Sequence, residues 1–238
     1  MAKMENLESN DGKAVDVGLR ANQLAALSHH LLELAEAEKA SLARELHDEL
    51  GACLTVISLD ISIVAEKLRQ TEPELVTKLD RAITRIKEAV ALKRRLIEGL
   101  RPSMLDSLGL SACLTEHALE FERRTGLPVI TEFSQKFDNM DANAAICLYR
   151  IAEESLLNIE KHAGARHVWM TLQEHNGGAH LLIEDDGVGI ASDAAAAPES
   201  VGLISMRERM IARNGTFAAH RRHAGSGTTV EAWLPAPL

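Results

Sequence analysis

Apolar residues recur at helical spacing over most of the first hundred positions, and this pattern constrains the fold more than any other feature. Leucines recur every three or four residues over 24–34, and apolar residues continue the series over 42–68 after a polar interruption. The polar segment 70–73 supplies a turn, and a second apolar series covers 75–100. Arg101 precedes a proline, which pushes its backbone out of the helical region. The sequence therefore predicts two long helices joined by a short turn.

A hairpin of two helices leaves apolar surface uncovered, because each helix has an apolar face that needs more than one neighbour. A second copy of the hairpin is the natural cover. We therefore expect a homodimer whose hairpins form a four-helix bundle, with an N-terminal coiled coil protruding from it. Residues 1–18 are polar and lack a period, which predicts a flexible start before a helical domain over 19–102.

The remaining residues, 103–238, mix helical and strand patterns and are expected to form a second domain. Helices are predicted over 111–124, 141–161 and 201–214, and strands over 129–133, 167–174, 179–184, 216–222 and 228–234. A turn at Asn176-Gly177-Gly178 links two of these strands into a hairpin. The predicted fold class is α+β: a helical hairpin followed by an α/β sandwich whose helices cover one face of the sheet.

Composition excludes several classes of function. The 238 residues carry a formal charge of −9, which disfavours a polyanion-binding surface and direct contact with nucleic acid. The aromatic residues are few, with two Trp, one Tyr and four Phe, so base-stacking platforms are not expected either. No apolar run is long enough to span a bilayer and no signal peptide is visible, which predicts a cytoplasmic protein without a membrane span.

His47 is the first candidate for chemistry. It follows a seam leucine, Leu46, by one residue and is therefore rotated about 100° away from the seam toward solvent. Asp48 follows directly, so a carboxylate can hold the proton on one ring nitrogen while the other acts as a nucleophile. A solvated surface pair is the alternative interpretation of these two residues alone.

A second group of candidates lies on the helix expected over 141–161. Glu154, Asn158 and Lys161 share one flank of this helix, and His162 follows. A carboxylate and an amide oxygen four residues apart can hold Mg²⁺, and the two basic side chains suit phosphate oxygens. An ordinary amphipathic helix with ion-paired residues remains the alternative.

Three glycine-bearing segments follow. The strand that ends at Asp185-Asp186 runs into Gly187 and Gly189, and a carboxylate there can accept the exocyclic amine of adenine. Gly202 and Leu203 begin a helix, whose free N–H groups favour phosphate. Thr228 follows a glycine in the last predicted hairpin. Each segment by itself is also compatible with an ordinary turn or helix start.

Taken together and in this order, the segments resemble bacterial two-component sensor histidine kinases of the subfamily that pairs with LuxR-type response regulators. Residues 43–51 resemble the phosphoacceptor box, and 100–110 resemble the junction between the two domains. The helix with Glu154 and Asn158 resembles the N box. The segments 186–189, 202–209 and 227–228 resemble the glycine boxes.

The resemblance implies an ATP-dependent protein-histidine kinase with Mg²⁺ as cofactor. His47 would receive the γ-phosphoryl group, and Asp48 would act as the base beside it. Asn158 with Glu154 would hold Mg²⁺, and Asp186 would read adenine. The pocket would be shaped by Gly187, Gly189, Gly202, Leu203 and Thr228, with Lys161 and His162 toward phosphate and a lid over Ala191–Ser200.

Two positions depart from the family pattern. Ala52 stands where a glutamine usually serves dephosphorylation of the partner, which predicts weak phosphatase activity. Ser205 stands where a glycine is common, which affects the pocket near phosphate.

The partners implied are a second copy of the chain and the receiver domain of a response regulator. The input signal is expected from a separate sensor protein or from a further part of a longer native protein. A nucleotide-binding dimeric scaffold with little or no catalysis is the main alternative. A serine kinase of the anti-sigma type shares the ATPase domain but lacks the helical hairpin, and the N-terminal helices weigh against it.

Overall fold

The computed structural model describes residues 27, 30–190, 201–222 and 225–235. These form two compact units: Glu33–Ser103 is one, and Met104–Leu238 belongs to the other. The flexible start expected at 1–18, the first residues of the coiled coil and the lid expected at Ala191–Ser200 lie outside the described residues.

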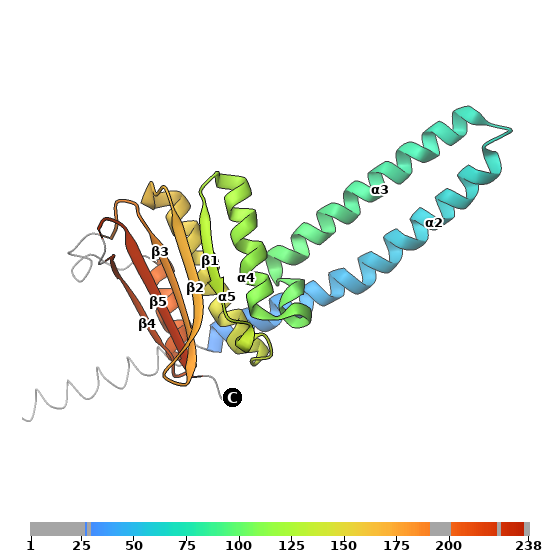
Figure 1. Cartoon of the computed structure of the whole chain (residues 1–238). Coiled ribbons are helices and arrows are strands. Elements are labelled where there is room, and N and C mark those ends of the chain that lie inside the picture. Colours follow the sequence, from blue (N-terminus) through green and yellow to red (C-terminus); the bar gives the residue numbers. More distant parts are fainter. Residues whose placement is uncertain (1–26, 28–29, 191–200, 223–224, 236–238) are drawn as a thin grey trace, which may run out of the picture. The chain divides into compact units, whose positions relative to one another are not determined.

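The helical unit is an antiparallel hairpin (Figure 1). Residues 30–45 are α-helical, a five-residue π-helix η1 follows at Leu46–Leu50, and α2 covers Gly51–Leu68. The return helix α3 is Pro73–Leu100. Proline is favoured at the first helical position, where its missing N–H costs nothing. Arg101 is extended, with φ −154° and ψ 125°, so the helix ends where the sequence predicts.

Apolar side chains remain exposed along the hairpin. Leu50, Ile57 and Val64 follow one another every seven residues and are 45%, 46% and 46% exposed. On α3, Leu92 and Leu96 are half exposed as well. Among the residues that the structure describes, no helix is long and apolar enough to cross a membrane. The heptad spacing of the exposed residues is the pattern that a helix–helix contact requires.

The second unit is built on a five-stranded sheet in the order β1-β2-β3-β5-β4. The strands are β1 Val129–Phe133, β2 Val168–His175, β3 Gly178–Asp185, β4 Thr216–Arg221 and β5 Thr228–Pro235. β1 runs parallel to β2, and the other neighbours are antiparallel. The predicted turn joins β2 to β3: His175 pairs with Gly178, and both Asn176 and Gly177 have positive φ, as a two-residue hairpin turn requires.

Three helices lie over one face of this sheet, as predicted (Figure 1). They are α4 Ser103–Thr125, α5 Ala142–Asn158 and α6 Val201–Ile211. Asp141 begins α5 by accepting the N–H groups of Asn143 and Ala144, both at 3.0 Å. α5 continues into a second π-helix, η3 Ile159–Ala163, which ends at a left-handed glycine, Gly164.

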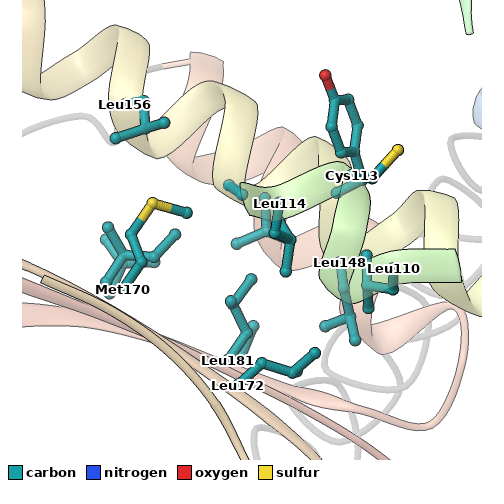
Figure 2. Close-up of a cluster of buried hydrophobic side chains, with 14 of the residues drawn as sticks. Leu110, Cys113, Leu114, Leu148, Leu156, Met170, Leu172 and Leu181 are labelled. Carbon is teal, nitrogen blue, oxygen red and sulfur yellow. The ribbon is translucent and has the colours of Figure 1, made fainter. Parts of the chain in front are cut away.

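The core lies between these helices and the sheet. Leu110 and Leu114 of α4, Leu148 of α5, and Leu172 and Leu181 of the central strands meet there and are at most 1% exposed (Figure 2). Strand alternation supplies the sheet side of this layer, because every second residue of β2 and β3 points to the same face.

α4 is broken at Gly109, which the sequence analysis did not predict. Gly109 has φ 85° and ψ 179°, and a Cβ there would lie 2.7 Å from Cα of Asp138. The carboxylate of Asp138 accepts the N–H and the hydroxyl of Ser111, both at 2.8 Å. Asp138 therefore caps the second half of α4, and glycine permits both the backbone angle and the close approach.

Candidate active site

A cavity of about 220 Å³ opens in the second unit between α5, η3, the end of β3, the start of α6 and β5. Most of its lining is apolar, including Ile159, Ile183, Leu203 and Val230. Pockets for whole small molecules measure roughly 300–1,000 Å³, so the described residues enclose space for only a part of such a molecule.

Asp185 is the carboxylate that lines this cavity. It is the last residue of β3, and strand alternation places it on the buried face with Ile183, where it is 2% exposed. Its Oδ1 accepts the N–H of Gly187 at 2.8 Å. A carboxylate among apolar side chains is suited to accept an amine from a flat ring that fills the cavity.

Asp186, the residue expected to read adenine, is surrounded by hydrogen-bond donors from the loop before β2. Its Oδ1 accepts the N–H groups of Arg166 and His167 at 2.6 and 2.9 Å, and its Oδ2 lies 2.9 Å from Nδ1 of His167. Burial by itself raises the pKa of Asp186, but the hydrogen bonds from the His167 ring and from the two N–H groups lower that pKa to about 2. Asp186 ties the loop before β2 to the loop after β3 and is not among the residues that line the cavity. Of the two adjacent aspartates, the structure therefore places Asp185 at the cavity, whereas the sequence analysis expected Asp186 there.

The predicted residues of the N-box helix separate into two sets. Asn158 and His162 line the cavity. Glu154 lies outside its lining, with its carboxylate against Gly202 at the start of α6, and Lys161 is exposed. The π-helix η3 changes the rotation of Lys161 and His162 relative to a continuous α-helix, and such π turns are frequent at functional sites.

The glycine segments meet around the same cavity. Gly189, Leu203 and Thr228 line it, whereas Gly187 and Gly202 do not. A side chain at Gly187 would clash with the carbonyl group of Ala163, whose oxygen accepts the N–H of Val188 at 2.9 Å. Gly187 is therefore required by a close contact between protein backbones, which brings the loop after β3 against the end of η3.

His47 lies in the π-helix η1 and is exposed, as are Asp48 and Glu49. The exposure agrees with the predicted rotation away from the seam, and the π turn itself was not predicted. Ala52 is exposed on the next turn, and Ser205 is half-buried in α6 outside the cavity lining. In the described residues, no group of three or more His, Cys, Asp or Glu is arranged to hold a metal ion.

Sequence reasoning missed Asp185, Ser155 and the apolar side chains around them. Alternation along the predicted strand 179–184 was a usable signal, because it places 181, 183 and 185 on one face and 186 on the other. For Ser155, the helical face shared with Ile151 and Ile159 pointed inward, yet nothing in the sequence distinguished a cavity wall from the core.

Family comparison gives two matches that together cover most of the chain. Residues 38–105 match the family described as "Histidine kinase". Residues 143–238 match the family described as "Histidine kinase-, DNA gyrase B-, and HSP90-like ATPase". The first match contains His47, and the second contains the cavity.

Curated relatives agree with these matches. The chain is 33% identical over 216 residues to "Sensor histidine kinase MctS" of Rhizobium johnstonii, a match that covers 90% of this chain and 46% of the relative. It is 29% identical over 238 residues to "Signal transduction histidine-protein kinase/phosphatase DegS" of Brevibacillus brevis, covering 99% of this chain and 61% of the relative. The chain thus spans about half the length of the curated relatives that it matches.

A solved structure supports the fold. The histidine kinase domain of the blue-light activated histidine kinase EL346 from Erythrobacter litoralis has a TM-score of 0.50 at 18% identity, covering 77% of this chain and 94% of that chain. The two family matches and the relatives confirm the resemblance drawn from the sequence, and the chain belongs to the histidine kinases.

Proposed function

We propose that this chain is an ATP-dependent protein-histidine kinase that phosphorylates its own His47 and passes the phosphoryl group to an aspartate of a response regulator. One observation carries the proposal. A buried carboxylate, Asp185, stands in an apolar cavity of the ATPase-type unit, and an exposed His47-Asp48 pair stands on the hairpin unit of the same chain.

The cavity suits the adenine ring. Ile159, Ile183 and Val230 offer apolar contacts to its faces, and Asp185 offers an acceptor to its exocyclic amine. The N–H of Gly187 holds Oδ1 of Asp185, so the carboxylate is oriented before a base arrives. We assign adenine recognition to Asp185 and the joining of two loops to Asp186.

Asn158 and Glu154 fit a Mg²⁺ site. They lie four residues apart, Asn158 lines the cavity, and Glu154 reaches the start of α6. Mg²⁺ in nucleotide sites usually takes only one or two protein ligands and completes its shell with phosphate oxygens and water. When bound, it would neutralise charge on the phosphates. His162 at the cavity and the exposed Lys161 are the basic side chains that we place toward those phosphates.

In the proposed reaction the unprotonated ring nitrogen of His47 attacks the γ-phosphorus. A P–N bond forms, the P–O bond to the β-phosphate breaks, and ADP leaves. Asp48 accepts the proton from the other ring nitrogen, so the phosphorylated imidazole becomes neutral. The carboxylate of the receiver aspartate then attacks phosphorus, the P–N bond breaks, and the imidazole takes up a proton again. Both steps depend mainly on positioning and on neutralisation of the phosphoryl charge.

A second copy of the chain is the partner that we propose for the hairpin. Leu50, Ile57 and Val64 are exposed at heptad spacing, and packing against another hairpin would remove them from water. The receiver domain of a response regulator is the partner proposed for the surface around His47. Input from a separate sensor protein stays a prediction.

Incubation with Mg²⁺ and γ-labelled ATP tests the proposal. We expect a label that is stable in base and labile in acid, absent from His47→Gln and present in the matched control His30→Gln, which alters another exposed histidine of the same chain. ATP binding without any label would favour the nucleotide-binding scaffold instead.

A further inference from the structure

Lys93 occupies a position that the rest of its series gives to apolar residues. Leu79, Ile86, Lys93 and Leu100 follow one another every seven residues along α3, and all four are half-buried. This spacing places them on one face of the helix, the face that also contains the buried Ile97. A lysine in such a series lowers stability, because its charge is partly removed from water.

The ammonium group of Lys93 lies beside Gly51 at the start of α2. A Cβ built on Gly51 would be 2.9 Å from Nζ of Lys93. The absent side chain therefore leaves the space into which the lysine extends. Within the part of the chain that the structure describes, Lys93 has no hydrogen bond and no ion pair. It is thus an unpaired, half-buried cation.

Gly51 connects this cation to the turn that carries His47. The N–H of Gly51 is bonded to the carbonyl groups of His47 and Asp48, so Gly51 directly follows that turn on the helix. A Cα–Cβ bond tilts toward the N-terminus of its helix. The space beside Gly51 therefore lies toward the helix turn that contains His47, and the ammonium group of Lys93 occupies that space.

We propose that Lys93 binds the phosphoryl group on His47 and stabilises the phosphorylated form of the hairpin. This inference rests on the proposed function, because it takes His47 as the phosphoacceptor. The phosphoryl group brings close to two negative charges at neutral pH to a turn that has an unpaired cation beside it. Once His47 is phosphorylated, the ammonium group of Lys93 can form an ion pair with the phosphoryl group. Because Gly51 has no side chain, nothing at that position separates the two groups.

Four variants separate this role from a structural one. Lys93→Met removes the charge and keeps a long side chain, and Lys93→Arg keeps the charge. Gly51→Ala fills the space beside Nζ. Lys87→Met is the matched control, since Lys87 is an exposed lysine of the same helix.

Two measurements are made on each purified variant of the 238-residue chain. The first is the equilibrium constant of His47 phosphorylation, measured from labelled protein at fixed ratios of ATP to ADP. The second is the change in melting temperature when His47 is phosphorylated by phosphoramidate, a small donor that needs no ATP site.

We expect Lys93→Met to lower the equilibrium constant about two- to fivefold, the range of a partly exposed ion pair. We also expect Lys93→Met to raise the melting temperature of the unphosphorylated protein and to reduce the rise in melting temperature that phosphorylation of His47 causes. Gly51→Ala should also lower the equilibrium constant of His47 phosphorylation. For Lys93→Arg and Lys87→Met, the equilibrium constant and the melting shift should stay close to those of the unaltered chain.

An equilibrium constant and a phosphorylation-dependent melting shift in Lys93→Met equal to those of the unaltered chain would overturn the inference. A different result would show that the proposed kinase function is wrong: ATP would leave His47 unlabelled, while phosphoramidate would still phosphorylate it. The melting measurement tests Lys93 in that case as well.

Discussion

The exchange of Asp185 for asparagine tests the assignment of the base-reading residue. Asp185 is 2% exposed, lines the cavity and accepts the N–H of Gly187 at 2.8 Å. The amide oxygen of asparagine can keep this bond, so the fold should persist. The variant loses the charge, and with it a charge-assisted hydrogen bond to the base worth about 1.5–3 kcal/mol. This corresponds to a rise of roughly 10- to 150-fold in the Kd for ATP.

Asp186→Asn is the matched control, one residue away. Its carboxylate makes three contacts, to the N–H groups of Arg166 and His167 and to the His167 ring, at 2.6, 2.9 and 2.9 Å. The variant should lose about 1–2 kcal/mol of unfolding free energy, measured by urea denaturation, with the Kd for ATP changed less than about threefold. Hydrogen bonds hold the pKa of Asp186 at about 2, below the ordinary 3.8, so this stabilisation is present above pH 3.8 and is lost as pH falls through 2.

Isothermal titration of both variants with a nonhydrolysable ATP analogue and Mg²⁺ gives the two dissociation constants. The reasoning fails if Asp185→Asn binds within about threefold of the unaltered chain while Asp186→Asn loses more than tenfold. That result would assign the base to Asp186, as the sequence pattern first indicated.

Three further predictions concern the rest of the molecule. Gly109→Ala should cost about 2–4 kcal/mol of unfolding free energy in chemical denaturation, because φ is 85° and the Cβ would meet Asp138; a cost below 0.5 kcal/mol would contradict the tight approach. Burial lowers the pKa of His117 below 6.5, so the unfolded chain takes up a proton more readily, and stability should fall as pH drops through 6.5 and below. In melting curves between pH 5 and 8, His117→Phe should therefore lessen the dependence of melting temperature on pH. An unchanged dependence would refute the claim that His117 causes it. Ala52→Gln should raise phosphatase activity toward the phosphorylated regulator at least severalfold over the weak activity predicted for the unaltered chain, and a rate that does not rise would remove Ala52 as its cause.

Much of the fold was predictable because local chemistry determines it. Pro73 and Arg101 mark the two ends of α3, and Asn176-Gly177 fixes the β2–β3 turn through its positive φ values. The helix predicted from position 141 begins there, because Asp141 caps α5. In each case the residue type and the local geometry require one another, so the boundary can be read without knowledge of tertiary contacts.

The breaks inside helices were not predictable in this way. The π turns at Leu46–Leu50 and Ile159–Ala163 change the hydrogen-bond register of segments whose residues suit an ordinary helix. Gly109 interrupts α4 because Asp138, 29 positions later, packs against it and caps the following turn, and only the folded chain brings the two together.

The candidate site shows the same division. The segments that border the cavity were found from the sequence, and Asn158, His162, Gly189, Leu203 and Thr228 do line it. The choice between two adjacent aspartates depended on which face of β3 each occupies, and strand alternation would have favoured Asp185. Lys93 remained unnoticed because its significance depends on the missing side chain of Gly51, which belongs to the other helix of the hairpin.

The most direct test of the central claim is the ³¹P NMR spectrum of the 238-residue chain after incubation with ATP and Mg²⁺, joined with mass-spectrometric mapping of the modified peptide. The account predicts a phosphoramidate signal from a single histidine, located at His47, that is absent from His47→Gln and strongly reduced in Asp185→Asn. A signal that persists in His47→Gln, or a phosphate found on a serine or threonine, would contradict it.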